Sequence, residues 1–391
     1  MISVAEALEK VLSLGARLEA ETVPLRAASG RVLANDLRAK RTQPPFSASA
    51  MDGYAVCDAD WATGSTLRVI GEAAAGHAFS GTVSPGQAVR IFTGAPLPTG
   101  ADRVVIQEDV TRDSDIITLG HTLDTGRHVR PAGGDFREGD LFAAPRRLGP
   151  AEIALLASMN HAVVPVVRKP IVAIMATGDE LVAPGETPNP DQIIASNSYG
   201  IAAQLEAAGA ETRLLPIARD TRAALRDVFK MAKGADLIVT IGGASVGDHD
   251  LVAEVAADLN MEQSFYKIAM RPGKPLMAGN MDGTAMIGLP GNPVSSMVCS
   301  TLFILPLIAK MQGLPATAPK TTQHMLANDL TANGPREHYM RAQLGPDGTV
   351  KVHEAQDSAL MSVLAASNAL VVRPIRDPAR AKGDTVAVIT L

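Results

Sequence analysis

Residues 170–312 alternate short apolar runs with longer helical patterns, and this alternation limits the fold more than any other feature of the chain. The apolar runs lie at 171–176, 212–217, 237–241 and 285–289, and the helical patterns lie at 197–209, 221–233, 248–259 and 293–311. Alternation at this spacing predicts a doubly wound parallel α/β sheet with helices on both faces. In such a sheet, ligands bind beyond the carboxyl ends of the strands.

The rest of the chain divides where its pattern changes. Residues 3–20 have a helical period, whereas Gln43-Pro44-Pro45 cannot continue a helix, and 150–160 are again helical. Short apolar runs between turn residues make 47–140 β-like. The simplest interpretation is a β-rich domain at 47–140 inserted into a helical N-terminal domain at 1–46 and 141–169, to which the family resemblance given below adds a role in dimerisation. The α/β domain then covers 170–317, and a small β-barrel or sandwich covers 318–391.

Charge and cysteine content exclude several function classes. The chain has 36 Lys and Arg against 41 Asp and Glu, so it is acidic overall. Binding of nucleic acid by general electrostatic attraction needs a basic surface, which this composition does not supply. The only cysteines, Cys57 and Cys299, are too few for a disulfide framework or a thiolate zinc site. The longest apolar stretch, near 301–309, contains Pro306 and is too short to span a bilayer. We therefore expect a soluble cytoplasmic protein that binds neither nucleic acid nor membranes.

Two Gly-rich loops follow strands of the predicted sheet. Gly242-Gly243-Ala244-Ser245-Val246-Gly247 follows one strand, and Pro290-Gly291-Asn292-Pro293 follows another, with Ser295 just beyond it. Glycine lets the backbone approach a ligand, and N–H groups at a helix start attract anions. Neither established phosphate-loop pattern is matched. Phosphate binding and ordinary helix-start chemistry therefore both remain open for these loops.

Charged residues near the same strand ends suggest an anionic ligand. Lys267, Arg271 and Lys274 place three cations within eight residues, which fits either an anion clamp or a solvated loop. Glu180 and Asp250 would repel an anion unless a divalent cation bridges them, and Mg²⁺ accepts carboxylates together with phosphate oxygens. The residues favour a Mg²⁺-dependent, phosphate-bearing ligand, and the alternative is that both acids cap helices. An Asp placed like Asp220, just before a helix, is usually an N-cap.

Several motifs along the chain form one recognisable set. They are Ser49-Ala50-Met51-Asp52-Gly53-Tyr54-Ala55, Thr93-Gly94-Ala95-Pro96, Thr177-Gly178-Asp179-Glu180-Leu181, Gly242-Gly243-Ala244-Ser245-Val246-Gly247, Pro272-Gly273-Lys274-Pro275 and Leu289-Pro290-Gly291-Asn292-Pro293-Val294-Ser295. Together they resemble the molybdopterin molybdenumtransferase family, which completes molybdenum-cofactor synthesis and includes the E domain of gephyrin. They occur in the family's order and span nearly the whole chain.

This resemblance implies an elongated four-domain homodimer that inserts molybdenum from molybdate into adenylylated molybdopterin, giving molybdenum cofactor and AMP with the help of Mg²⁺. The active cleft would be shared, with the β-rich domain and chain end of one subunit facing the α/β domain of the other. A molybdopterin adenylyltransferase and molybdoenzymes are the partners that such a pathway would supply. Family positions with functional roles fall on Asp52, Thr93, Asp135, Glu180, Asp220, Asp250, Lys267, Arg271, Pro290 and Pro293.

These considerations define the expected site. Asp52, Glu180 and Asp250 are the expected metal ligands, and they join Lys267 and Arg271 as the expected catalytic residues. The expected substrate-binding residues are Thr93, Asp135, Asp220, Gly242, Gly243, Ser245, Gly247, Lys274, Pro290, Gly291, Asn292, Pro293 and Ser295. The cations would offset repulsion between molybdate, dithiolate and phosphates, which costs roughly 4 kcal/mol per close pair at an effective dielectric constant of 20.

The sequence departs from the family pattern in a few places. Arg271 stands where Lys is common, Ala244 where Val is common, and Gly134 where an acidic residue often precedes the Asp. Two other functions remain open. A molybdopterin adenylyltransferase shares the α/β fold but would not need residues 47–140. A gephyrin-like scaffold without catalysis would not need the intact acidic set.

Overall fold

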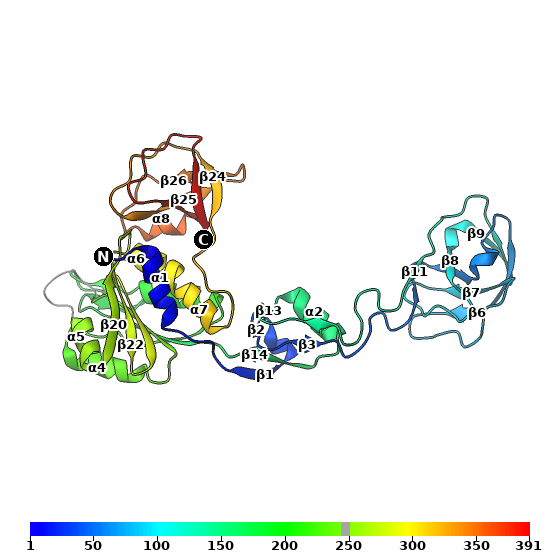
Figure 1. Ribbon diagram of the computed structural model, residues 1–391, viewed down its shortest axis with the longest axis horizontal. Coiled ribbons are helices and arrows are strands. Elements are labelled where there is room, and N and C mark those ends of the chain that lie inside the picture. The colour runs from blue at the N-terminus through cyan, green and yellow to red at the C-terminus, as the bar shows by residue number, and fades with distance from the viewer. Residues whose placement is uncertain (244–250) are drawn as a thin grey trace.

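The computed structural model describes residues 1–243 and 251–391 of the chain. Figure 1 shows an elongated molecule, with the α/β region and the C-terminal barrel at one end, the β-rich region at the other, and a narrow middle region between them. Both chain termini lie at the end that holds the α/β region and the barrel. The two ends of the molecule are therefore joined only through the narrow middle region.

The α/β region is built on a six-stranded sheet with the order β18-β15-β19-β23-β22-β20. Its strands are β15 (Ile171–Ala176), β18 (Glu211–Leu214), β19 (Leu237–Ile241), β20 (Met261–Lys267), β22 (Pro275–Met281) and β23 (Thr284–Leu289). The first three and β23 pair in parallel as predicted, but β22 and β20 are antiparallel. The reason is a tight hairpin between β22 and β23, in which Asp282 and Gly283 both have positive φ.

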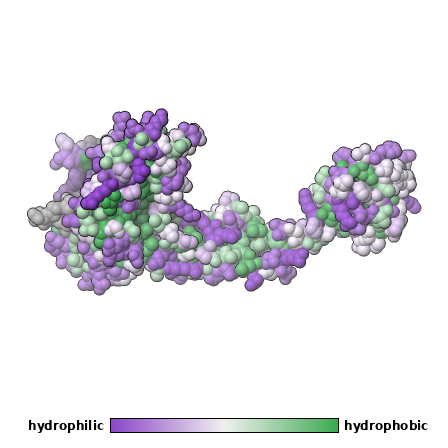
Figure 2. Space-filling model, turned by 45° about the horizontal axis from the view of Figure 1, so that its top comes forward, coloured by the Kyte–Doolittle hydropathy of each residue, from purple (hydrophilic) through white to green (hydrophobic). Residues whose placement is uncertain are grey.

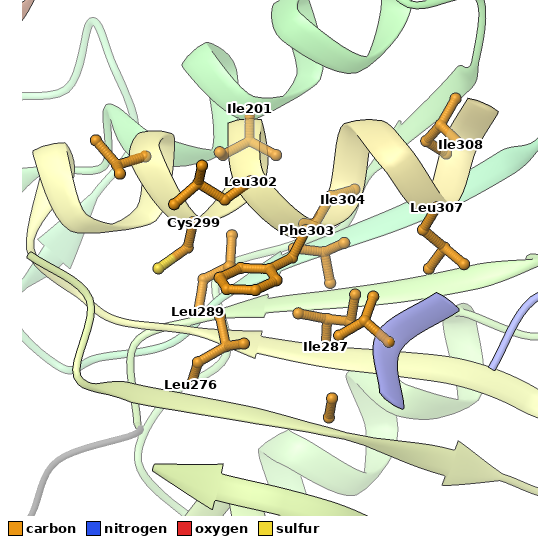
Figure 3. Packing of buried hydrophobic residues seen from close by; sticks show 14 of the residues in the cluster. Ile201, Leu276, Ile287, Leu289, Cys299, Leu302, Phe303, Ile304, Leu307 and Ile308 are labelled. Carbon is orange, nitrogen blue, oxygen red and sulfur yellow. The ribbon is translucent and has the colours of Figure 1, made fainter. Parts of the chain in front are cut away.

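Helices cover both faces of this sheet, as the alternation predicted. They are α3 (Asn197–Ala207), α4 (Arg222–Met231), α5 (Leu251–Asp258), α6 (Pro293–Cys299), the π-helical turn Ser300–Ile304 and α7 (Leu305–Met311). One core packs Ile174 and Ile287 against α3, α6 and α7, and the other packs Met175 and Met286 against α4 and α5. Figure 3 shows Ile287 and Leu289 of β23 facing Phe303 and its neighbours in the first core.

Residues Pro293–Met311 form one continuous helical stretch, as the helical pattern at 293–311 predicted, so the expectation that the apolar stretch around Pro306 is too short to span a bilayer is wrong. Pro306 occupies the first turn of α7, directly after the π-helical turn, where a missing N–H is tolerated. Among the described residues this is the one helix long and apolar enough to span a membrane, but 78% of its most apolar window is buried inside the protein. Its burial is that of a core helix.

The first helix, α1 (Val4–Ser13), is shorter than the predicted 3–20 and packs against the α/β core. Ser3 caps it by accepting a hydrogen bond from the Glu6 N–H. Ala7, Leu8 and Val11 are buried against α7 and the π-helical turn. The start of the chain thus contributes to the α/β core, not to the helical domain expected at 1–46.

The middle region was expected to be helical, yet it is mainly a four-stranded sheet with the order β1-β14-β2-β13. Its elements are β1 (Ala20–Pro24), β2 (Val32–Leu33), β13 (Arg146–Arg147), β14 (Val163–Val167) and the predicted helix α2 (Pro150–Ser158). The strands β2 and β13 have two residues each and are too short to show an alternating pattern, and β1 and β14 pair with each other across most of the N-terminal half of the chain, which explains the wrong expectation. The pairing of β3 (Leu37–Arg38) with β12 (Leu141–Phe142) brings together the two chain segments that lead to the β-rich region.

The β-rich region contains a six-stranded sheet with the order β8-β5-β7-β6-β10-β9. Its strands are β5 (Gly53–Val56), β6 (Thr66–Ala73), β7 (Gln87–Ile91), β8 (Arg103–Ile106), β9 (Val110–Asp113) and β10 (Ile116–Leu119). Two short strands, β4 (Ala48–Ser49) and β11 (Val129–Arg130), form a separate pair. Apolar residues on the two faces of the sheet form separate cores, which accounts for the turn-rich, alternating sequence.

The C-terminal region is a closed five-stranded barrel, as predicted. Its strands are β24 (Thr322–Leu326), β25 (Glu337–Leu344), β26 (Thr349–Val352), β27 (Ala369–Arg373) and β28 (Thr385–Thr390). The order β25-β26-β24-β28-β27 closes because β27 also pairs with β25. A two-residue strand, β21 (Met270–Arg271), pairs with β25 and fastens the barrel to the α/β region.

A buried histidine in the barrel predicts an acid-sensitive component of stability. Burial first, and then the charges of neighbouring arginines, lower the pKa of His338 from 6.5 to about 4. Between these values the unfolded chain binds a proton that the folded barrel does not, so the free energy of unfolding falls as the pH drops. The expected loss is about 3 kcal/mol in all, or about 1.4 kcal/mol per pH unit.

Urea unfolding between pH 4 and 7.5 measures this effect. The variant His338→Gln, which has no titrating group at this position, is expected to show a flatter dependence on pH in that window. Equal pH slopes for the variant and the native protein would contradict the assignment.

Candidate active site

A cleft of about 730 Å³ lies at the carboxyl ends of β15, β19 and β23, where an open α/β sheet is expected to bind its ligand. Seven residues predicted from the sequence line this cleft together. They are Glu180, Gly242, Gly243, Pro290, Gly291, Asn292 and Pro293. The two Gly-rich loops therefore meet at one site.

The turn after β19 requires glycine for steric reasons. Gly243 has a φ of +69°, and a Cβ atom at this position would lie 2.2 Å from Cγ2 of Val252. An L-amino acid would therefore be strained and would also clash with the start of α5. Because these glycines have no side chains, the backbone of the turn is uncovered at the wall of the cleft, where a ligand can contact it closely. Ser245, Gly247 and Asp250 lie outside the described residues.

The start of α6 lies next to this turn, because a Cβ atom at Gly291 would be 3.6 Å from Cα of Gly242. Asn292 is the N-cap residue and Pro293 occupies the first helical turn, as the helix-start interpretation expected. The Asn197 side chain donates to the Gly291 carbonyl over 2.7 Å and joins this loop to the start of α3. Ser295, although predicted, is buried inside α6 and does not line the cleft.

Glu180 lies on the loop after β15, and neighbouring residues hold this loop in place. Arg219 donates to the Asp179 carbonyl at 2.8 Å, and the Asp220 N–H donates to Asp179 Oδ1 at 3.2 Å. Asp220 was expected to cap α4, but the N-cap residue is Thr221, whose hydroxyl accepts a hydrogen bond from the Ala224 N–H. Asp220 thus supports the loop through its backbone and does not line the cleft.

The three predicted cations are divided between two places. Lys274 directly precedes Pro275, which lines the cleft, and the Lys274 carbonyl accepts from the Ile268 N–H at 3.0 Å. Lys267 is the last residue of β20 and is paired with Pro275 in the sheet. Arg271 lies elsewhere and lines a pocket of about 400 Å³ at the mouth of the barrel, beside His338. The described walls of the main cleft therefore include none of the three cations, although Lys274 is next to a residue that lines it.

Asp52 belongs to the β-rich region at the far end of the molecule, so one chain does not bring it to Glu180 (Figure 1). Its Oδ1 accepts from the Thr93 N–H at 2.8 Å and from the Thr93 hydroxyl at 2.7 Å. These two hydrogen bonds lower the pKa of Asp52, with a smaller contribution from the charge of Arg90. Gly53 is required next to it, because a Cβ there would lie 1.9 Å from the Val105 carbonyl oxygen.

Other residues around these sites were not predicted. Arg90 stacks on Phe92 and Tyr54, with its Cζ atom 4.7 and 5.2 Å from the two ring centres. Asp135, which was predicted, lies on the connection to the middle region, where its N–H donates to the Gln43 carbonyl. The Ser196-Asn197-Ser198 stretch lines the main cleft, and its helix-start composition was the one available signal.

The described residues of one chain contain no group of three or more His, Cys, Asp or Glu side chains that could hold a metal ion. The three-carboxylate site expected from Asp52, Glu180 and Asp250 is therefore not assembled in the part of the chain that is described. Glu180 alone still fits Mg²⁺ chemically, because this ion needs one or two protein carboxylates when phosphate oxygens and water complete its coordination.

Comparisons with known proteins match every region of the chain. The MoeA N-terminal region (domain I and II) matches residues 2–160, a probable molybdopterin binding domain matches 173–310, and the MoeA C-terminal region (domain IV) matches 323–391. A solved molybdopterin biosynthesis MoeA protein from Pyrococcus horikoshii OT3 is similar over 100% of both chains, with a TM-score of 0.86 at 27% identity.

Curated relatives match at higher identity. The molybdopterin molybdenumtransferase of Nostoc sp. is 36% identical over 97% of this chain and 91% of its own length. The molybdopterin molybdenumtransferase of Haemophilus influenzae is 33% identical over 99% of this chain and 98% of its own length. This chain belongs to the molybdopterin molybdenumtransferase family.

Proposed function

We propose that this protein inserts molybdenum from molybdate into adenylylated molybdopterin and releases molybdenum cofactor and AMP. The observation that carries the proposal is the cleft at the carboxyl ends of β15, β19 and β23, where both Gly-rich loops meet Glu180. Relatives named molybdopterin molybdenumtransferase that align over nearly the whole chain support the same reaction. They make a molybdopterin adenylyltransferase or a scaffold without catalysis the less favoured functions.

The chemistry of the cleft suits a ligand that carries a phosphate. The turn at Gly242-Gly243 has no side chains, so it and the start of α6 allow close contact with phosphate oxygens. Lys267 and Lys274 offset the repulsion between the substrate anions. Mg²⁺ held by Glu180 would neutralise charge on the phosphate that is cleaved. Asp52, ionised at neutral pH because its hydrogen bonds stabilise the carboxylate, would orient the attacking group.

The reaction requires two chains in this proposal, because Asp52 and Glu180 lie at opposite ends of one. A symmetric homodimer would place the β-rich region of one copy against the α/β cleft of the other. The narrow middle region exposes apolar side chains, including Leu141 (53% exposed) and Val163 (52% exposed), which are available to a second copy. Figure 2 shows hydrophobic surface on this middle region.

Cytoplasmic location and contacts with a molybdopterin adenylyltransferase or molybdoenzymes are part of the same proposal. The free cysteines Cys57 and Cys299 suit a reducing compartment. Such partners would supply the unstable substrate and accept the finished cofactor.

Removal of the Glu180 charge tests the main cleft. We expect Glu180→Gln to lower the rate of molybdenum insertion at least about 100-fold, because a neutral amide is a much weaker ligand for Mg²⁺. The assay uses purified protein with adenylylated molybdopterin, molybdate and MgCl₂, and follows both AMP release and cofactor formation. Glu9→Gln, which makes the same change at an exposed position of α1 outside the cleft, is the control. A Glu180→Gln enzyme as fast as the native one would remove Glu180 from the reaction.

The hydrogen bonds to Asp52 predict a change in pH dependence. Thr93→Val removes the hydroxyl donor and keeps the backbone N–H, so the pKa of Asp52 rises part of the way toward its ordinary value. If the ionised form is the active one, the acid limb of the rate profile moves to higher pH. Rates measured from pH 4 to 8 check the direction. An unchanged acid limb, or a shift to lower pH, would rule out ionised Asp52 as the group that sets this limb.

A further inference from the structure

The Asp52 carboxylate is held from several directions in the β-rich region. The Thr93 N–H and hydroxyl both donate to its Oδ1 atom, at 2.8 and 2.7 Å. The backbone is fixed as well, because the Gln107 N–H donates to the Asp52 carbonyl at 3.1 Å. Among the described residues, none donates a hydrogen bond to Oδ2 of Asp52. One carboxylate oxygen is therefore available to a ligand, in a direction that the surrounding protein sets.

Arg90 links the segments that hold Asp52 in this orientation. It lies on β7, directly opposite Tyr54 of β5. Its Nη1 atom donates to the Gly53 carbonyl at 3.1 Å, and its Nη2 atom donates to Oε1 of Gln107 at 2.7 Å. One guanidinium thus bridges the residue that follows Asp52 and the residue whose N–H holds the Asp52 carbonyl.

Two aromatic rings fix the position of this guanidinium. The Cζ atom of Arg90 lies 4.7 Å from the ring centre of Phe92 and 5.2 Å from that of Tyr54. Phe92 directly precedes Thr93, so the stack lies beside the residue that donates to Asp52. These contacts together suit arginine and not lysine. An ammonium carries the same charge, but it is not a planar fork of donors that can stack on two rings.

We propose that Arg90 is a positioning residue for the reaction, because its contacts hold the Asp52-Gly53 backbone and so direct the free carboxylate oxygen toward the substrate. This inference rests on the proposed function, which gives Asp52 its part in the reaction. A small displacement is sufficient to matter, since misplacing a reacting group by about 1 Å can lower a rate about 100-fold. The alternative is that Arg90 only stabilises the sheet.

Arg103 provides the comparison that separates these two roles. It lies in the same sheet, at the end of β8 opposite to the end that leads into Gln107 and so to Asp52. Its Cζ atom lies 4.0 Å from the ring centre of Trp61, and its side chain forms an ion pair with Asp58. Arg103→Lys therefore weakens the same kinds of contact in the β-rich region without touching the Asp52-Gly53 backbone, and it is the matched control.

Steady-state kinetics of purified full-length variants tests the proposal. Arg90→Lys keeps the charge but loses the fork, so we expect kcat for molybdenum insertion to fall at least about tenfold while KM for adenylylated molybdopterin stays within about threefold. Gln107→Ala removes one anchor of the fork and is expected to lower kcat as well. Because both changes break one bridge, the double variant is expected to be no slower than Arg90→Lys alone. Arg103→Lys is expected to lower the free energy of unfolding and keep kcat within about twofold.

Hydrogen exchange of backbone amides, measured by NMR, gives a readout that does not depend on activity. In Arg90→Lys the N–H groups of Thr93 and Gln107 that donate to Asp52 are expected to exchange at least about tenfold faster than in the native protein, whereas Arg103→Lys leaves them within about twofold. A native kcat in Arg90→Lys would overturn the proposal, as would unchanged exchange at both amides or an equal loss of kcat in Arg103→Lys. A native protein that inserts no molybdenum would count against the proposed function, and the exchange rates would still decide whether Arg90 holds the Asp52-Gly53 backbone.

Discussion

The insertion of the β-rich region into the middle region is the constraint on which the rest of the account depends. The chain leaves through β3 and returns through β12, and these two strands pair with each other. At the other end of the middle region, Arg168 and Asp236 form two hydrogen bonds of 2.6 Å that tie it to the α/β sheet. Asp236 also accepts from the Ile171 N–H at the start of β15. Paired strands and a bidentate ion pair hold the two ends of the molecule apart, so Asp52 remains far from Glu180 within one chain.

This separation fits the electrostatics of the proposed reaction. Molybdate, a dithiolate and a phosphate repel one another, so the proposed reaction needs cations close to the substrate. In the proposed dimer the main cleft of one copy would supply the glycine turn and Glu180, and the β-rich region of the other would supply Asp52, whose carboxylate accepts two hydrogen bonds from Thr93.

The parts of the fold that could be predicted were those with strong local patterns. Continuous apolar runs located β15 and β19 to the residue, and the Gly-rich loops after β19 and β23 line one cleft. The antiparallel strands β20 and β22 were missed, although Asp282-Gly283 is a hairpin signal, because attention to strand–helix alternation favours parallel pairing. The middle sheet was missed because β1 pairs with β14, and β2 with β13, across more than 100 residues of chain, and no local pattern encodes that.

The most direct measurement of the central claim is complementation between two inactive variants. Asp52→Asn and Glu180→Gln are each purified, unfolded together and refolded as a mixture, or co-expressed with different tags and isolated as the mixed species. If the active site is shared between subunits, random mixing restores about a quarter of the native sites, because half of the dimers are mixed and each mixed dimer has one intact site of two. The account predicts this recovery of molybdenum insertion. A mixed dimer that is as inactive as either parent would contradict it.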